Sequence, residues 1–164
     1  MKTHEEYMEL ALEEARKAEE IDEVPVGCVI VCGGEVISRG HNLKEQLNQA
    51  YAHAEMIAIQ KAAEVKGNWC LNDCDLYVTL EPCMMCTGII NLSRIRTVYY
   101  GTTDPKGGCL ETVIDLKKIN RLNHYPNIVG NILQKECSEI LTNYFRKKRE
   151  IIKEKKQKNK ANIQ

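Results

Sequence analysis

The sequence predicts a three-layer α/β/α fold built on a mixed sheet of five strands. Of its 164 residues, 43% are hydrophobic and 28% are charged, which is typical of one globular domain. Helical and strand patterns alternate along most of the chain, as they do when helices connect parallel strands. Near the N-terminus, Gly33-Gly34 separates two strand patterns and predicts a hairpin, which adds an antiparallel pair to the sheet.

The first third of the chain predicts one helix and this hairpin. Thr3 and Glu6 have the spacing of a capping box, and apolar residues then recur at helical spacing. We therefore predict a helix that ends near Glu20. Residues 26–31 and 35–38 are rich in side chains that favour strands, and they predict the two arms of the hairpin.

The remaining elements follow in alternation. Gly67 is predicted to stop a helix, Gly101 to close a strand, and Pro82 to open a helix. The predicted segments are a helix at 53–65, a strand at 76–80, a helix at 82–92, a strand at 97–100, a loop at 101–112, a short strand at 128–133 and a helix at 135–153. Residues 1–150 are predicted to form the domain, and residues 151–164 a basic tail that frays.

Composition limits the class of protein. No run approaches the roughly 18 apolar residues of a membrane span, and the first residues lack the apolar stretch of an export signal. We expect a soluble cytoplasmic protein with no membrane partner. In that reducing compartment, the eight cysteines favour metal binding or burial over a disulfide framework.

Charge is balanced overall but unevenly distributed. Lys plus Arg and Asp plus Glu are 23 each. Residues 1–23 hold nine acids against three bases, whereas residues 146–160 hold nine bases against two acids. The basic segment is a candidate contact for a phosphate backbone, although a solvated helix end explains the same charges.

Two short segments hold residues with the chemistry of a metal site. Cys83 and Cys86 are three apart, so on a helix they share a face and suit one zinc ion. His53 would supply a third ligand, and a catalytic zinc leaves its fourth position to water. Glu55 lies two residues after the histidine, where its carboxylate would stand beside that water. Helix N-termini at both segments would favour thiolates.

Other interpretations of these residues stay open. The two cysteines alone are compatible with a redox pair or with buried, unliganded thiols. A structural zinc site would need a fourth ligand, which Cys70 or Cys74 could supply, but such a site has no use for Glu55.

The combination of a His-x-Glu motif with a Pro-Cys-x-x-Cys motif is the signature of zinc nucleobase deaminases. Both motifs and several segments resemble the bacterial tRNA-specific adenosine deaminases, within the zinc-dependent cytidine and deoxycytidylate deaminase superfamily. The resembling segments are Val24-Pro25-Val26-Gly27, His41-Asn42, Ala52 to Met56, Tyr77 to Cys86, Arg94-Ile95, Tyr100-Gly101, Asp104-Pro105-Lys106 and Phe145-Arg146.

This resemblance implies a fold, an activity and partners. It implies a cytidine deaminase-like fold and hydrolysis of adenosine to inosine at the wobble position of a tRNA anticodon. It also implies one Zn2+ per subunit, a tRNA anticodon stem-loop as substrate, and a homodimer. An adenine in a stacked helix cannot reach such a pocket, so the base must be single-stranded or flipped out.

The resemblance also assigns roles to individual residues. It implies Glu55 as the catalytic proton shuttle and His53, Cys83 and Cys86 as the metal ligands. The implied substrate-binding residues are Asn42, Val26, Ala54, Asp104, Lys106 and Arg146. For this last group, purely structural interpretations stay open. Asn42 could be a turn residue and Val26 a core residue, and the charged side chains could simply be solvated at the surface.

Two segments depart from the usual pattern of these deaminases. Gln49-Ala50-Tyr51-Ala52 replaces an Asp-Pro-Thr-Ala segment, and Glu111 replaces a typical glycine within 107–112. Both segments are expected near the substrate. They leave open a zinc deaminase of a free base, nucleoside or nucleotide, of the guanine or deoxycytidylate type. A non-catalytic RNA-binding zinc subunit is the other alternative.

Overall fold

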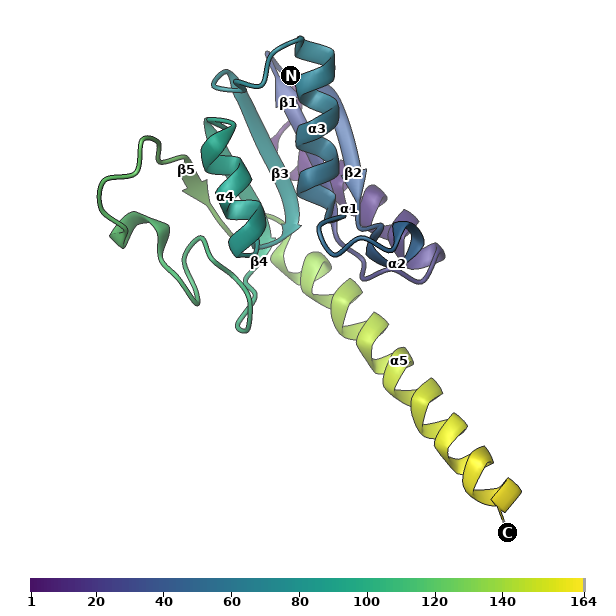
Figure 1. Cartoon of the computed structure of the whole chain (residues 1–164). Coiled ribbons are helices and arrows are strands. Elements are labelled where there is room, and N and C mark those ends of the chain that lie inside the picture. The colour runs from purple at the N-terminus through teal and green to yellow at the C-terminus, as the bar shows by residue number, and fades with distance from the viewer. Residues whose placement is uncertain (164) are drawn as a thin grey trace.

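The computed structural model describes residues 1–163 and contains the expected sheet of five strands, in the spatial order β2-β1-β3-β4-β5 (Figure 1). The strands are β1 (Gly27–Cys32), β2 (Glu35–His41), β3 (Cys74–Leu80), β4 (Thr97–Thr102) and β5 (Asn127–Val129). The helices are α1 (His4–Glu20), α2 (Lys44–Leu47), α3 (Ala54–Lys66), α4 (Met84–Leu92) and α5 (Gln134–Ile163), with a 3-10 turn at Leu116–Lys118.

Strand directions confirm the mixed sheet. Strand β1 pairs antiparallel with β2 and with β3, whereas β3–β4 and β4–β5 are parallel. Strand β3 therefore ends at the edge of the sheet where β1 begins. Helices α3 and α4 also begin at this edge, which is the lower end of the sheet in Figure 1. We call it the catalytic edge.

Two separate apolar layers hold the helices against the sheet. On one face, α3 and α4 pack on side chains such as Ile30, Leu76 and Val98. On the other face, α1 and the start of α5 pack on Val29, Val31 and Tyr77. The α/β/α order predicted from the alternation of elements is thus confirmed.

Local signals account for several boundaries. Thr3 caps α1 with the reciprocal capping box that its spacing to Glu6 predicts. Gly67 ends α3 in the left-handed region, with φ 63°, which a glycine adopts without strain. Pro82 lies just before α4 rather than in its first turn, because Cys83 is the N-cap.

Other boundaries differ from the predictions. Gly101 lies inside β4 instead of closing it. A glycine is needed there because its backbone packs against Cys137, and a Cβ would approach the sulfur to 2.3 Å. Strand β5 covers only Asn127–Val129 instead of 128–133, and α2 had no sequence signal.

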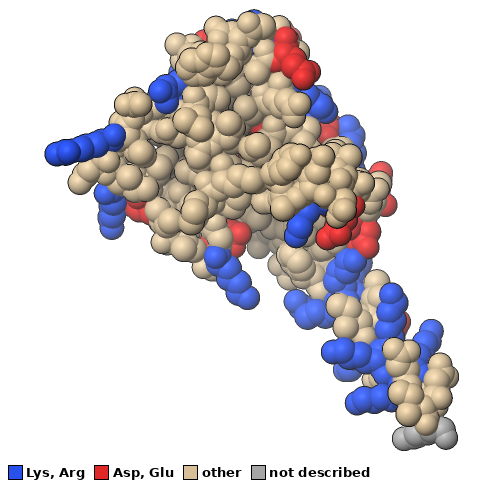
Figure 2. All heavy atoms as spheres, viewed as in Figure 1, with Lys and Arg blue, Asp and Glu red and all other residues tan. Residues whose placement is uncertain are grey.

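Helix α5 is the largest difference, since it continues to Ile163 instead of ending near residue 153. Its second half contains neither glycine nor proline and consists mainly of good helix formers. Residues 151–163, which were expected to fray, therefore form a helical extension of α5. Gln164 lies outside the described residues. The extension is exposed and basic throughout, and it projects away from the domain (Figure 2).

None of the helices described over residues 1–163 combines the length and apolar character needed to cross a bilayer.

Candidate active site

Three potential metal ligands meet at the catalytic edge. The Nδ1 atom of His53 lies 3.6 Å from the Sγ atom of Cys83 and 3.6 Å from that of Cys86. One ring nitrogen facing two sulfurs at equal distance is poor geometry for two hydrogen bonds. A tetrahedral zinc with Zn–S near 2.3 Å and Zn–N near 2.05 Å would place nitrogen and sulfur about 3.6 Å apart. The donor set and its spacing therefore fit zinc.

Helix N-termini position two of these ligands. His53 is the N-cap of α3 and Cys83 is the N-cap of α4, each in extended conformation and neither using its side chain to cap the helix. Both side chains are thereby left available to a ligand. Cys86 lies one turn into α4 on the same side and is buried.

The electrostatics of the cluster favour a deprotonated sulfur. Hydrogen bonds from Cys86 and His53 lower the pKa of the Cys83 thiol to about 4. The same contact with Cys83 raises the pKa of His53. Metal binding needs the thiolate and a neutral imidazole, so a bound dication would displace the proton that this contact favours on His53.

Glu55 lies in the first turn of α3, beside this cluster. Only 3% of it is exposed, and it lines the same cavity as His53 and Cys83. Burial raises the pKa of its carboxyl to about 7. A buried acid directed into a cavity that contains metal ligands has the properties of a proton-transfer group.

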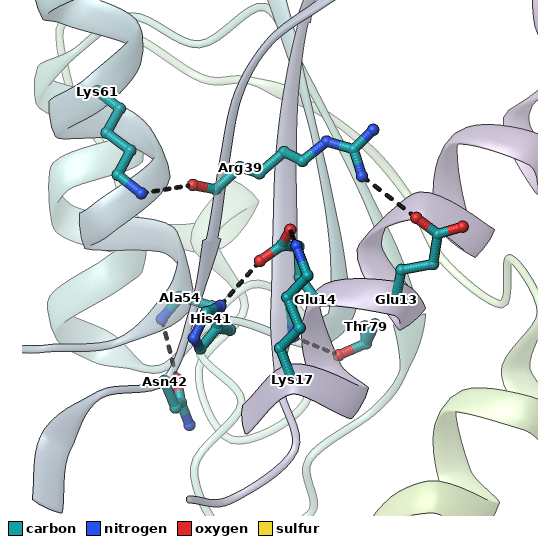
Figure 3. Close-up of polar contacts among 10 residues, drawn as sticks. Glu13, Glu14, Lys17, Arg39, His41, Asn42, Ala54, Lys61 and Thr79 are labelled. Carbon is teal, nitrogen blue, oxygen red and sulfur yellow. Dashed lines mark hydrogen bonds and ion pairs between the residues drawn. The ribbon is translucent and has the colours of Figure 1, made fainter. Parts of the chain in front are cut away.

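The side chain of Asn42 is fixed by the backbone of α3. Its Oδ1 accepts a hydrogen bond of 2.9 Å from the Ala54 amide (Figure 3). Because a backbone N–H only donates, the amide oxygen must face α3, and the Nδ2 donors remain for a ligand. Asn42 also lines the cavity. Ala54 is buried beneath it and contributes its amide rather than its side chain.

These residues surround one cavity of about 680 Å³, which we call the catalytic cavity. Its volume lies within the usual range for small-molecule sites. Of the substrate-binding residues expected from the sequence, Val26, Asn42 and Asp104 line it. Lys106 instead lines a second groove, together with Asp104, Phe145 and Arg149. Arg146 is exposed and lines neither.

The sequence interpretation assigned no role to Glu81, which also lines the cavity. This buried carboxylate accepts hydrogen bonds from the backbone amides of Asp104, Leu110, Glu111 and Thr112, and from the Thr112 hydroxyl. A Cβ at Gly108 would lie 2.4 Å from it, so only glycine fits. Glu81 therefore fastens the loop of residues 104–112 to the strand that leads into the Cys83 motif. The sequence signal that could have pointed to Glu81 is its position directly before the Pro-Cys motif.

Helix α5 also contributes to the cavity wall. Tyr144, Phe145 and Lys148 line it, although the sequence pointed to Arg146. Lys148 forms an ion pair with Asp22, with Nζ and Oδ2 2.6 Å apart, and Tyr144 hydrogen-bonds the same carboxylate. These contacts fix the middle of α5 at the mouth of the cavity.

The two unusual segments do not enter the catalytic cavity. Tyr51 is more than half exposed and is not among its lining residues. The carboxylate of Glu111 accepts a hydrogen bond of 2.7 Å from the Tyr100 hydroxyl. This bond raises the pKa of Tyr100 further, beyond the effect of burial. Glu111 thus has a structural partner in the fold.

Comparison with known families agrees with this geometry. A family model described as the cytidine and deoxycytidylate deaminase zinc-binding region matches residues 1–102, a range that contains His53, Glu55, Cys83 and Cys86. The chain belongs to this deaminase family. Zinc is accordingly the cofactor of this deaminase, and the His/Cys/Cys cluster supplies a fitting set of donors.

Within the deaminase family, the chain is similar to tRNA-specific adenosine deaminases and to a guanine deaminase. The tRNA-specific adenosine deaminase of Bacillus subtilis (strain 168) is 48% identical over 143 residues, covering 87% of this chain and 89% of the relative. A solved structure from studies of A-to-I editing by tRNA:A34 deaminases at the wobble position has a TM-score of 0.80 and 46% identity, covering 83% and 99%. The guanine deaminase of Bacillus subtilis has a TM-score of 0.60 and 38% identity, covering 62% and 66%.

Proposed function

We propose that this deaminase converts adenosine to inosine at the wobble position of a tRNA anticodon. The observation that carries the proposal is a buried Glu55 beside the potential zinc ligands His53, Cys83 and Cys86, at the wall of a cavity large enough to admit a nucleoside. The similarity to tRNA-specific adenosine deaminases over most of the chain supports tRNA as the substrate.

Glu55 performs the proton transfers. A zinc ion held by His53, Cys83 and Cys86 would lower the pKa of a bound water to roughly 7 and so make that water easy to deprotonate at neutral pH. The Glu55 carboxylate accepts the proton of the attacking water and passes it to N1 of the adenine ring. It then carries the second proton of that water from the oxygen to the exocyclic amine, so that the C6–N bond breaks, ammonia leaves and the water oxygen becomes the inosine O6. The net reaction consumes one water and releases one ammonia.

Asn42 orients the base. Its oxygen is held by the Ala54 amide, so its Nδ2 presents donors to an acceptor such as a purine ring nitrogen. Val26 adds apolar wall beside it, at the entrance to β1. These contacts fix how the ring lies relative to Glu55.

The RNA is held outside the catalytic cavity. The second groove adjoins the cavity, since Val24, Leu80, Asp104 and Phe145 line both. It presents Lys106 and Arg149 for phosphates, and Phe145 is 43% exposed and available for stacking on a flanking base. Arg146 and the basic extension of α5 continue this positive surface away from the domain (Figure 2).

A guanine deaminase is the alternative that a specific observation favours. The solved Bacillus subtilis guanine deaminase is 38% identical, but its match covers only 62% of this chain. A free base has no phosphate chain, so it gives no purpose to the basic surface of α5. The substrate assay below separates the two activities.

The direct test is deamination of a synthetic anticodon stem-loop with adenosine at the wobble position. Nucleoside mass spectrometry of the zinc-loaded protein should detect inosine. Glu55→Ala should lower the rate by about 10²–10⁴-fold, with unchanged zinc content. Deamination of guanine without inosine in the stem-loop would assign the alternative. Parental activity in Glu55→Ala would remove the proton shuttle.

We further infer a cytoplasmic homodimer. Met84, Gly88 and Leu92 recur every four residues on α4, and 67% of Met84 and 63% of Leu92 are exposed. Beside Met84 and Gly88, a shallow hollow is lined by Ile114, Leu116, Ile119 and Leu122. Such an apolar face next to a catalytic helix suits a second subunit. Cytoplasmic tRNA would be accessible to this enzyme.

A further inference from the structure

A second cluster of cysteines lies at the end of the sheet opposite the catalytic edge. Cys32 is the last residue of β1 and Cys74 is the first residue of β3, and the two are direct partners in the antiparallel register. This end of the sheet is uppermost in Figure 1. Neither cysteine lines the catalytic cavity, so the cluster lies outside the site described above.

The backbone pairing brings the two side chains close together. The Cys74 carbonyl accepts a hydrogen bond from the Arg96 amide, and the Cys74 amide donates to the Leu71 carbonyl. The backbone N–H and C=O of Cys74 thus bond to residues other than those of β1. Cys32 and Cys74 are therefore a non-hydrogen-bonded pair of the antiparallel ladder. Such pairs have Cα atoms about 4.5 Å apart, within the range that a disulfide spans. Their sulfurs and the Asp73 carboxylate lie within 4.8 Å of one another.

Charged neighbours distinguish the two sulfurs. The Lys66 ammonium lies 3.6 Å from the Sγ atom of Cys32 and 2.5 Å from an oxygen of Asp73. The Cys32 thiol also donates a hydrogen bond of 3.4 Å to the Asp73 carboxylate, and Cys32 is partly exposed, so a small oxidant can reach its sulfur. Cys74 is fully buried, and burial raises the pKa of its thiol to about 12. Cys32 is thus placed to react first and Cys74 second.

The ammonium also argues against a second metal ion. Two thiols and a carboxylate form a conceivable ligand set, but Lys66 already provides the positive charge between Cys32 and Asp73. A metal ion would have to displace this cation and repel it.

We propose that Cys32 and Cys74 are a site of reversible oxidation that closes to a disulfide with a hydroperoxide. The Cys32 thiolate attacks the O–O bond: an S–O bond forms, the O–O bond breaks, and the alcohol or water leaves with one proton. The Cys74 sulfur then attacks the resulting sulfenic acid, and hydroxide leaves as water with the Cys74 proton. Two thiols are oxidised and one hydroperoxide is reduced. Two equivalents of a small thiol reverse the change through a mixed disulfide and are themselves oxidised to a disulfide.

The bond would tie together the two ends of residues 33–73, the segment that carries Asn42, His53 and Glu55. Closing a loop of this length removes conformational freedom from the unfolded chain. The oxidised protein should therefore unfold at a temperature at least about 5 °C higher than the reduced protein.

The test is peptide mapping of the zinc-loaded full chain after exposure to limiting hydrogen peroxide. We expect a linked peptide that joins Cys32 to Cys74, which a thiol reductant separates. Cys32→Ser should abolish this link, and Cys70→Ser, altered in the neighbouring loop, should leave it intact. Because Cys32 lies at the partly exposed end of β1, its serine variant should keep the fold.

Three results would overturn the proposal. They are a link through Cys70 instead of Cys74, further oxidation of Cys32 to a sulfinic acid with no link, and no oxidation at either residue. Measurement of zinc content decides the remaining question. A second zinc per chain that is lost in Cys32→Ser would make the cluster a metal site instead.

Discussion

At the scale of single residues, the hydrogen bond from the Ala54 amide decides which atoms of Asn42 are available to a substrate. The Ala54 amide occupies its oxygen, so in the role proposed for Asn42 its Nδ2 donors would bind the base. Asn42→Asp keeps an acceptor for Ala54 and nearly the same shape, but it removes those donors. We expect kcat/KM for the stem-loop to fall about 10–100-fold, or roughly 1.4–2.7 kcal/mol of transition-state binding.

Controls for Asn42→Asp separate recognition from folding. Its zinc content and thermal midpoint should match those of the parent, since the Ala54 contact survives. Unchanged kcat/KM would mean that Asn42 only closes the turn after β2, the simpler role that the sequence left open.

At the scale of elements, the buried Glu14 carboxylate of α1 links that helix to His41, the last residue of β2. The Glu14 carboxylate accepts hydrogen bonds of 2.8 Å from Lys17 and from Nδ1 of His41, the residue before Asn42 (Figure 3). Burial by itself would raise the pKa of Glu14, but these two partners outweigh it and lower the pKa below its ordinary value of 4.5.

The lowered pKa fixes the sign of a pH effect. The ionised Glu14 stabilises the fold above about pH 4.5, and this contribution is lost as the pH falls through the lower, folded-state pKa. Glu14→Gln should therefore cost about 1–3 kcal/mol of unfolding free energy at pH 7 and much less near pH 3. Urea unfolding of parent and variant at both pH values measures this difference. An equal loss at both would show that charge is not the cause.

Helix α5 carries the second prediction at this scale. Its extension contains Lys153, Lys155, Lys156, Lys158 and Lys160, all exposed. Replacing these five by glutamine keeps good helix formers but removes the charge. If they contact phosphates, the slope of log binding constant against log salt should become shallower by roughly 2–4. Binding of full-length tRNA measured at several salt concentrations gives this slope.

The minimal stem-loop provides the control for this set of variants. Its turnover at saturation should stay near the parental value, because the extension lies outside the catalytic cavity. An unchanged salt slope would assign the lysines to solvation alone.

Sequence patterns predicted the elements well and the contacts between distant elements poorly. The capping box at Thr3, the stop at Gly67 and the alternation of strands and helices are local, and each is confirmed. Spacing also identified His53, Cys83 and Cys86, whose side chains meet as expected. The five hydrogen bonds at Glu81, by contrast, come from a loop more than twenty residues away. No periodicity reports such a contact.

Considered as a whole, the molecule places its functions at different ends. The N-termini of α3 and α4 and the middle of α5 meet at the catalytic edge, whereas the Cys32–Cys74 pair lies at the opposite end of the sheet. The net charge of the chain is zero, although the extension of α5 is basic and projects away from the domain. Net charge therefore could not indicate a nucleic-acid partner, whereas the distribution of charge along the chain could.

The assembly state gives the prediction that concerns the whole molecule. Beyond the adjacent turns of α4, a Cβ at Gly88 would meet no atom within 4 Å, so Gly88→Glu should leave the folded subunit undisturbed. It would place a charge in the middle of the apolar face that Met84 and Leu92 define. Sedimentation velocity at micromolar concentration should show a dimer for the parent and a monomer for Gly88→Glu. Val65→Glu, a change at an exposed position of α3, should stay dimeric. A monomeric parent, or a dimeric Gly88→Glu, would exclude this face as the subunit interface.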